Sequence, residues 1–186
     1  SSYQNNHYSN FKIVVIDNGS NDGTKDYVND KFPDIKVLSL EQNLGYSGGF
    51  NKGIKYVMNS YSPDYILISN NDVKVHKKVI ASLVKTGEQN KDSGFVTGKV
   101  YYYDYNGKKN IIQTFGKRFH SSHLIGSHIG TGEIDEGQYD NLKELDICDD
   151  VFTLVHKSVI LETKGYDENF FHEGEELDWQ LRAKKL

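Results

Sequence analysis

The chain of 186 residues has one cysteine, two prolines and no long hydrophobic run. The single cysteine, Cys148, excludes an internal disulfide framework and fits a reducing compartment. No segment approaches the ~18 apolar residues typical of a membrane span, and the polar first residues do not resemble a signal peptide. A formal net charge of −4 argues against a general nucleic-acid binder, which usually has a basic face. We therefore expect a cytoplasmic protein with no nucleic-acid partner.

The chain also lacks repeats, low-complexity segments and proline-rich linkers. Its length suits one domain with a sizeable core. Hydrophobic residues make up only 37%, but 13 Tyr and 9 Phe supply large apolar area. We therefore predict one domain over residues 1–186.

Short apolar runs alternate with helix-length amphipathic segments through the first hundred residues. This alternation predicts an α/β fold with a mostly parallel sheet, flanking helices and right-handed crossovers. Residues 104–146 break the rhythm, and we expect loops and irregular strands there, over one side of the sheet. The expected strands are 12–16, 35–40, 65–69, 95–101 and 151–155, and the expected helices are 22–31, 47–61, 76–89, 157–163 and one from about 175.

The most informative segment is residues 11–24, where an apolar β-branched run ends in Asp17, Asn18, Gly19 and Ser20. The run predicts a buried strand. Because open α/β sheets bind ligands at the carboxyl ends of their strands, the polar residues predict a ligand site.

A glycine-rich segment, residues 43–53, follows a predicted strand and opens a predicted helix. Backbone N–H groups at a helix start can receive an anion. The segment matches neither the G-x-G-x-x-G pattern nor the P-loop, so neither dinucleotide nor P-loop chemistry is supported. A tight loop and close helix packing explain the glycines equally well.

A third apolar run, residues 65–69, ends in Asn70, Asn71 and Asp72. A carboxylate at a strand end can ligate Mg²⁺ or Mn²⁺, which can bridge the phosphates of a nucleotide. Taken alone, a turn or helix cap is the simpler explanation, since Asn and Asp are common in both.

The fourth segment carries a dense group of acids next to aromatic residues. Acids in a first helical turn are favoured by the helix dipole, whereas a carboxylate in a cleft beside aromatic rings can act as a general base. The acids are Asp167, Glu173, Glu175, Glu176 and Asp178, and the aromatic residues are Phe170, Phe171 and Trp179.

In this order, the four segments resemble the family 2 glycosyltransferases, which have the GT-A fold, and in particular the bacterial rhamnosyltransferase-like enzymes of surface polysaccharide synthesis. The resemblance implies inverting transfer of a sugar from a UDP- or dTDP-linked donor to a saccharide or lipid-linked saccharide acceptor. It also implies a divalent cation, Mg²⁺ or Mn²⁺. Peripheral association with the inner face of the membrane and homo-oligomer formation are further expectations.

The resemblance gives the candidate residues their roles. Asp17 is expected to hold the nucleoside, and Asp72, at the place of the family's D-x-D motif, to bind the metal. Glu176 stands where the family has the Asp of its Glu-Asp pair and is the expected base, with Asp178 as the alternative. The implied nucleotide-sugar residues are Asp17, Asn18, Ser20, Asn43, Gly45, Gly49, Asn51, Asn71 and Asp72.

The chain departs from the family pattern in two ways. Asn70 replaces the first acid of D-x-D, which predicts low metal affinity until the donor supplies oxygens. The family's first strand and helix have no counterpart here, so we expect a fragment with little activity of its own, and unpaired backbone groups beside the gap. Two other functions stay open: a catalytically silent nucleotide- or saccharide-binding module, and a sugar-phosphate nucleotidyltransferase.

Histidines and a pair of acids complete the candidates. His120, His123 and His128 fit no common zinc spacing and are expected to be ordinary surface or acceptor-loop residues. The pair at 149–150 suits an acceptor loop or a solvated turn equally well. His172, beside the group of acids, is a better candidate for a sugar or metal contact than these three histidines.

Overall fold

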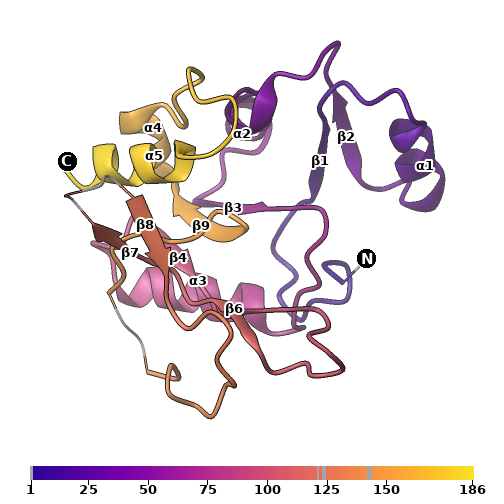
Figure 1. Cartoon of the computed structure of the whole chain (residues 1–186). Coiled ribbons are helices and arrows are strands. Elements are labelled where there is room, and N and C mark those ends of the chain that lie inside the picture. Colours follow the sequence, from indigo (N-terminus) through magenta and orange to yellow (C-terminus); the bar gives the residue numbers. More distant parts are fainter. Residues whose placement is uncertain (1, 121, 123–124, 142–143) are drawn as a thin grey trace.

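The computed structural model describes residues 2–120, 122, 125–141 and 144–186 (Figure 1). Every predicted helix and strand is present within a few residues, except that the strand expected at 95–101 is divided into two. In chain order the elements are β1 (Val14–Asp17), α1 (Thr24–Lys31), β2 (Lys36–Ser39), α2 (Gly45–Tyr61), β3 (Tyr65–Ser69), α3 (Val79–Gln89), β4 (Phe95–Thr97), β5 (Val100–Tyr101), β6 (Ile112–Thr114), β7 (Lys117–His120), β8 (Ile125–His128), β9 (Phe152–His156), α4 (Lys157–Thr163) and α5 (Glu175–Ala183).

Strand pairing is mixed in direction. β1 and β2 pair in parallel, with Asp17 opposite Ser39. β9 lies between β3 and β4 and is antiparallel to both. Of these three strands only β9 departs from the predicted mostly parallel arrangement: β3 and β4 run in the same direction, whereas the chain enters β9 beside Ser69, at the end of β3, and runs back along it.

The main core cluster holds α5 against the sheet. Trp179 is 1% exposed, and its ring packs against Tyr166 and Phe95 at centroid distances of 4.4 and 5.4 Å. Its Nε1 donates to Thr163 Oγ1 at 2.5 Å. These contacts fix the direction in which the first turn of α5 points. The cluster also contains Ile54, Ile68, Val155, Val159 and Ile160.

The described residues between β4 and β9 include two short antiparallel pairs beside the α/β part, β5 with β6 and β7 with β8, in line with the irregular strands expected within 104–146 (Figure 1). Lys117 N donates to Ile147 O at 2.8 Å and Ile147 N to Lys117 O at 3.2 Å, which ties β7 to the segment before β9. His120 and His128 lie in β7 and β8, and His123 lies outside the described residues. No helix in the described part of the chain is long and apolar enough to cross a membrane.

Candidate active site

The end of β1 and the start of α2 form one hydrogen-bonded unit. Asn18 Nδ2 donates to Asn43 Oδ1 at 3.0 Å and to Gly45 O at 2.9 Å, while Asn18 Oδ1 accepts from Leu44 N at 3.0 Å. A Cβ on Gly49 would lie 2.9 Å from Asn18 Nδ2, so this amide packs directly on the helix. The structure thus brings Asn18, Asn43, Gly45 and Gly49 together.

The first N–H groups of α2 already have acceptors within the protein. Gly45 N donates to Asn43 Oδ1 at 2.9 Å, and Tyr46 N to Phe171 O at 2.8 Å. Gly45 has φ +73° and its added Cβ would lie 2.5 Å from Phe171 O, so only glycine suits this close approach. Loop closure and packing therefore explain this glycine better than an anion at the helix start.

Asp17 shapes the turn after β1. Its side chain is buried, and its Oδ1 accepts from Ser20 N at 3.0 Å, while Ser20 itself is exposed. Asn51 lies elsewhere: its Oδ1 accepts from Tyr166 N at 3.0 Å and its Nδ2 donates to Tyr166 O at 2.9 Å. Asn51 therefore joins α2 to the turn before α5.

Asn71 and Asp72 lie in the exposed turn after β3. Among the described residues, none makes a hydrogen bond or ion pair with the Asp72 carboxylate. The preceding Asn70 is anchored, because its N–H donates to Val151 O at 3.1 Å. The turn thus presents a carboxylate beside the segment that leads into β9.

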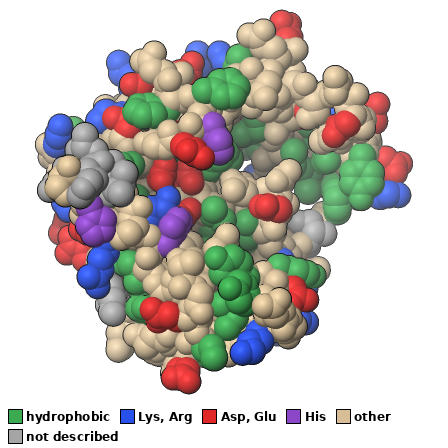
Figure 2. Space-filling view, viewed as in Figure 1, with side chains coloured by type: hydrophobic (Ala, Val, Ile, Leu, Met, Phe, Trp, Pro, Cys, Tyr) green, Lys and Arg blue, Asp and Glu red, His purple; other side chains and the backbone are tan. Residues whose placement is uncertain are grey.

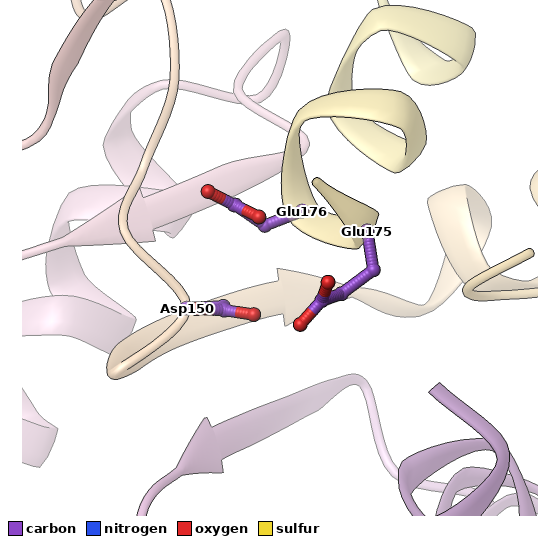
Figure 3. A group of neighbouring side chains, drawn as sticks. All are labelled: Asp150, Glu175 and Glu176. Carbon is purple, nitrogen blue, oxygen red and sulfur yellow. The ribbon is translucent and has the colours of Figure 1, made fainter. Parts of the chain in front are cut away.

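The first turn of α5 and the segment before β9 bring three acids together. One carboxylate oxygen from each of Asp150, Glu175 and Glu176 lies within 4.8 Å of the other two. We call these three residues the carboxylate cluster. In Figure 3, Asp150 and Glu175 point toward each other, and Glu176 projects from the same turn of α5.

Two side chains fix the geometry of the carboxylate cluster. Gln180 Oε1 accepts from Cys148 N and Gln180 Nε2 donates to Cys148 O, both at 2.7 Å and both buried. Tyr46 OH lies 3.2 Å from Asp150 O and 3.4 Å from Asn70 Oδ1. The starts of α2 and α5, the end of β3 and the segment before β9 therefore meet at one place.

Lys117 supplies positive charge at this place. Its Nζ lies 2.5 Å from Glu176 Oε1 and 3.5 Å from Asp149 Oδ2. The Lys117 and Glu176 side chains are only 14% and 12% exposed. His128 Nδ1 lies 3.1 Å from Asp149 Oδ2. In Figure 2, acidic, lysine and histidine side chains gather near α5 on the face shown.

Burial perturbs the protonation of the carboxylate cluster. It raises the pKa of Asp150 from 3.8 to about 7, and the negative charges of Glu176, Asp149 and Glu175 add to the effect, while Lys117 opposes it. Burial is also the main cause of a raised pKa for Glu175. Neither Asp150 Oδ2 nor Glu175 Oε2 has a hydrogen-bond partner among the described residues. The cluster can therefore hold a proton near neutral pH.

A family model for glycosyl transferase family 2 matches residues 1–160. The chain belongs to this family. One relative of this family 2 chain, the low-salt glycan biosynthesis hexosyltransferase Agl10 of Haloferax volcanii, is 25% identical over 174 residues, covering 94% of the chain and 53% of that protein. Another, the poly-β-1,6-N-acetyl-D-glucosamine synthase of Staphylococcus epidermidis, is 25% identical over 176 residues, covering 94% and 39%. The chain thus spans about half the length of these relatives, or less.

Solved structures with the same fold include Staphylococcus aureus TarS 1–349 in complex with UDP, with a TM-score of 0.62 and 14% identity. The match covers 98% of the family 2 chain and 48% of that chain. The mannosyltransferase PcManGT from Pyrobaculum calidifontis, in complex with GDP-Man and Mn²⁺, has a TM-score of 0.64, 14% identity and coverage of 98% and 46%. The predicted GT-A fold is confirmed.

The two candidate bases of the family 2 chain have different surroundings. Asp178 Oδ2 lies 2.7 Å from Arg182 Nε, and Arg182 also donates to Thr163 O and Gly165 O at 3.0 and 2.7 Å. Asp178 therefore belongs to the packing of α5 on the end of α4. Glu176 instead lies in the carboxylate cluster with Lys117, a residue for which the sequence offered no signal.

We expect Asp150→Asn to remove a pH dependence of stability. Because the Asp150 pKa is raised in the folded state, that state binds more protons, and the free energy of unfolding falls as pH rises from about 4 to about 7. Each pKa unit corresponds to about 1.4 kcal/mol. When only half of the Asp150 shift is counted, the free energy of unfolding of Asp150→Asn gains roughly 2 kcal/mol over that of the native protein at about pH 8, compared with about pH 5.

Urea denaturation of both proteins at these two pH values measures this difference. Asp92→Asn, in an exposed turn, is the matched control and should leave the native pH dependence unchanged. Equal pH dependence in the native protein and Asp150→Asn would contradict the buried, proton-binding state of Asp150.

Proposed function

We propose that residues 1–186 are part of the catalytic domain of an inverting glycosyltransferase of surface polysaccharide synthesis. Its donor would be a UDP- or dTDP-linked sugar and its acceptor a saccharide or lipid-linked saccharide. The observation that carries this proposal is a largely buried Glu176 within the carboxylate cluster of a family 2 chain. The similar proteins support it: one is a hexosyltransferase, and two were solved in complex with UDP or with GDP-Man and Mn²⁺.

The proposed donor site lies at the ends of β1 and β3. Asp17 and Ser20 would contact the nucleoside, and the turn with Asn71 and Asp72 would face the diphosphate. Asn18 and Asn43 would contribute by holding the loop between these two regions, since their amides bond to each other and to the start of α2. Asn51 would act at a distance, through Tyr166.

A divalent cation suits Asp72. Its exposed carboxylate has no partner among the described residues, and Mg²⁺ and Mn²⁺ often bind through one or two carboxylates together with substrate phosphates. A bound ion would offset the charge that develops on the leaving diphosphate. With Asn70 in place of a second acid, the donor would have to supply most of the remaining oxygens.

The proposed reaction is a single displacement. Glu176 takes the proton of an acceptor hydroxyl, and the hydroxyl oxygen forms a bond to the anomeric carbon. The bond from this carbon to the diphosphate oxygen breaks, and the diphosphate leaves with the electron pair. Attack from the opposite side inverts the configuration. Asp178 suits the role less well, because it lies outside the carboxylate cluster and, through Arg182, belongs to the packing of α5 on the end of α4.

Calorimetry tests the donor site directly. We expect the complete gene product to bind UDP or dTDP more tightly with Mn²⁺ than without it, and Asp72→Ala to lose this metal-dependent part. Asp92→Ala, which removes another exposed carboxylate, is the matched control. Failure to bind either nucleotide would contradict the donor site. Equal metal dependence in the native protein and Asp72→Ala would contradict the role of Asp72.

A further inference from the structure

We propose that Lys117 is a positioning residue for the general base: its ammonium group holds the Glu176 carboxylate in place and offsets the negative charge of the acids around it. The inference rests on the proposed function and extends it to a residue outside the four sequence segments. It begins from the ion pair of Lys117 Nζ and Glu176 Oε1 at 2.5 Å.

The backbone of Lys117 fixes the place of its ammonium group. Lys117 exchanges two backbone hydrogen bonds with Ile147, at 2.8 and 3.2 Å, only three residues before Asp150. Through Gln180, Cys148 of the same segment is bound to α5. The backbone of Lys117 is therefore bonded to the segment that carries Asp150, and its side chain is bonded to Glu176 of α5. Because its backbone is already fixed, the Lys117 side chain loses little additional conformational freedom when it holds Glu176 in position.

The surrounding charges require a cation. Asp149, Asp150, Glu175 and Glu176 converge here, and among the described residues Lys117 is the only lysine or arginine in an ion pair with any of them. The other titratable groups that face these acids are imidazoles and phenols. They are His128 against Asp149, His172 with Nδ1 4.0 Å from Glu175 Oε1, and Tyr46 and Tyr166 near Asp150 and Glu175.

This arrangement distinguishes the acids of the carboxylate cluster from one another. Burial acts to lower the pKa of Lys117, but the hydrogen bond to Glu176 and the charge of Asp149 raise it overall, so the side chain stays protonated. Glu176 is in direct contact with this positive charge, whereas Asp150 makes no ion pair with a lysine or arginine in the described part of the chain. The raised pKa values thus belong to Asp150 and Glu175, whereas Glu176 is the acid of the cluster that pairs with the ammonium group.

The test is the pH dependence of sugar transfer by Lys117→Met and Lys117→Gln in the complete gene product. Both remove the charge, so we expect the acidic limb of kcat/KM to move to higher pH by about one unit, with about tenfold lower activity below the limb and recovery above it. The donor KM should not change. Lys117→Arg keeps the charge and should keep the native limb.

The matched control is Lys157→Met, which removes a second ion pair with the same N–O distance of 2.5 Å, to the exposed Asp64 in a different part of the fold. Its pH profile should be native. The inference is overturned if the acidic limb is unchanged in Lys117→Met or Lys117→Gln, whether activity is lost equally at every pH or not lost at all. Lys117 would then have only a structural role. Absence of sugar transfer by the native protein would instead overturn the proposed function.

Discussion

Glu176→Gln is expected to lower kcat for sugar transfer by about 10²- to 10⁴-fold, the usual contribution of a positioned general base. The amide cannot accept the proton of the acceptor hydroxyl, yet it has nearly the same size. Because the proposed role of Glu176 is contact with the acceptor hydroxyl and not with the nucleotide, nucleotide binding measured by calorimetry should stay close to native. Single-turnover rates at saturating donor separate the chemical step from binding.

Asp178→Asn is the matched control for this prediction. It removes the ion pair with Arg182, which also donates to Thr163 O and Gly165 O, so its main effect should be on stability. Most of the activity per folded molecule should remain. Loss of transfer in Asp178→Asn together with retention in Glu176→Gln would show that Asp178 is the base.

Trp179→Ala is expected to lower the free energy of unfolding by about 3–5 kcal/mol, as for other large buried aromatic residues. Its ring is 1% exposed and packs between Tyr166 and Phe95, and its Nε1 donates to Thr163 Oγ1. Truncation leaves a cavity and removes the Nε1 donor from the part-buried Thr163 hydroxyl. Because Trp179 anchors the turn that carries Glu175 and Glu176, the variant should also lose transfer activity.

Urea denaturation measures this loss of stability, and Tyr27→Ala is its control. Tyr27 is an aromatic residue of α1 that is 62% exposed, and its truncation should change stability by less than about 0.5 kcal/mol. A Trp179→Ala variant as stable as Tyr27→Ala would contradict the anchoring role of Trp179.

The helices and strands of this chain were predictable because their signals are local. The run of apolar residues at 65–69 coincides with β3, and the one-sided apolar stripe at 79–84 lies in α3. The direction of β9 was not predictable, since it depends on where a connection of about fifty residues returns to the sheet. Periodicity within 151–155 carries no information on that point.

The candidate site was predictable in part, for the same physical reason. The polar strand ends and the acidic start of α5 are visible in the sequence. The structure brings the acids at the start of α5 together with Asp150. Lys117 could not be found this way, because it meets Glu176 across 59 positions and lies in a region without regular pattern. Asn18 and Asn51 look like ligand residues in the sequence, yet their amides are engaged within the protein.

A donor screen on the complete gene product tests the central claim most directly. The protein is incubated with UDP- and dTDP-linked sugars, Mn²⁺ and saccharide acceptors, and the product is analysed by NMR. The account predicts transfer from one donor class, an anomeric configuration opposite to that of the donor, and product formation by Glu176→Gln that is slower by about 10²-fold or more. A product of retained configuration, or equal product with Glu176→Gln, would contradict it.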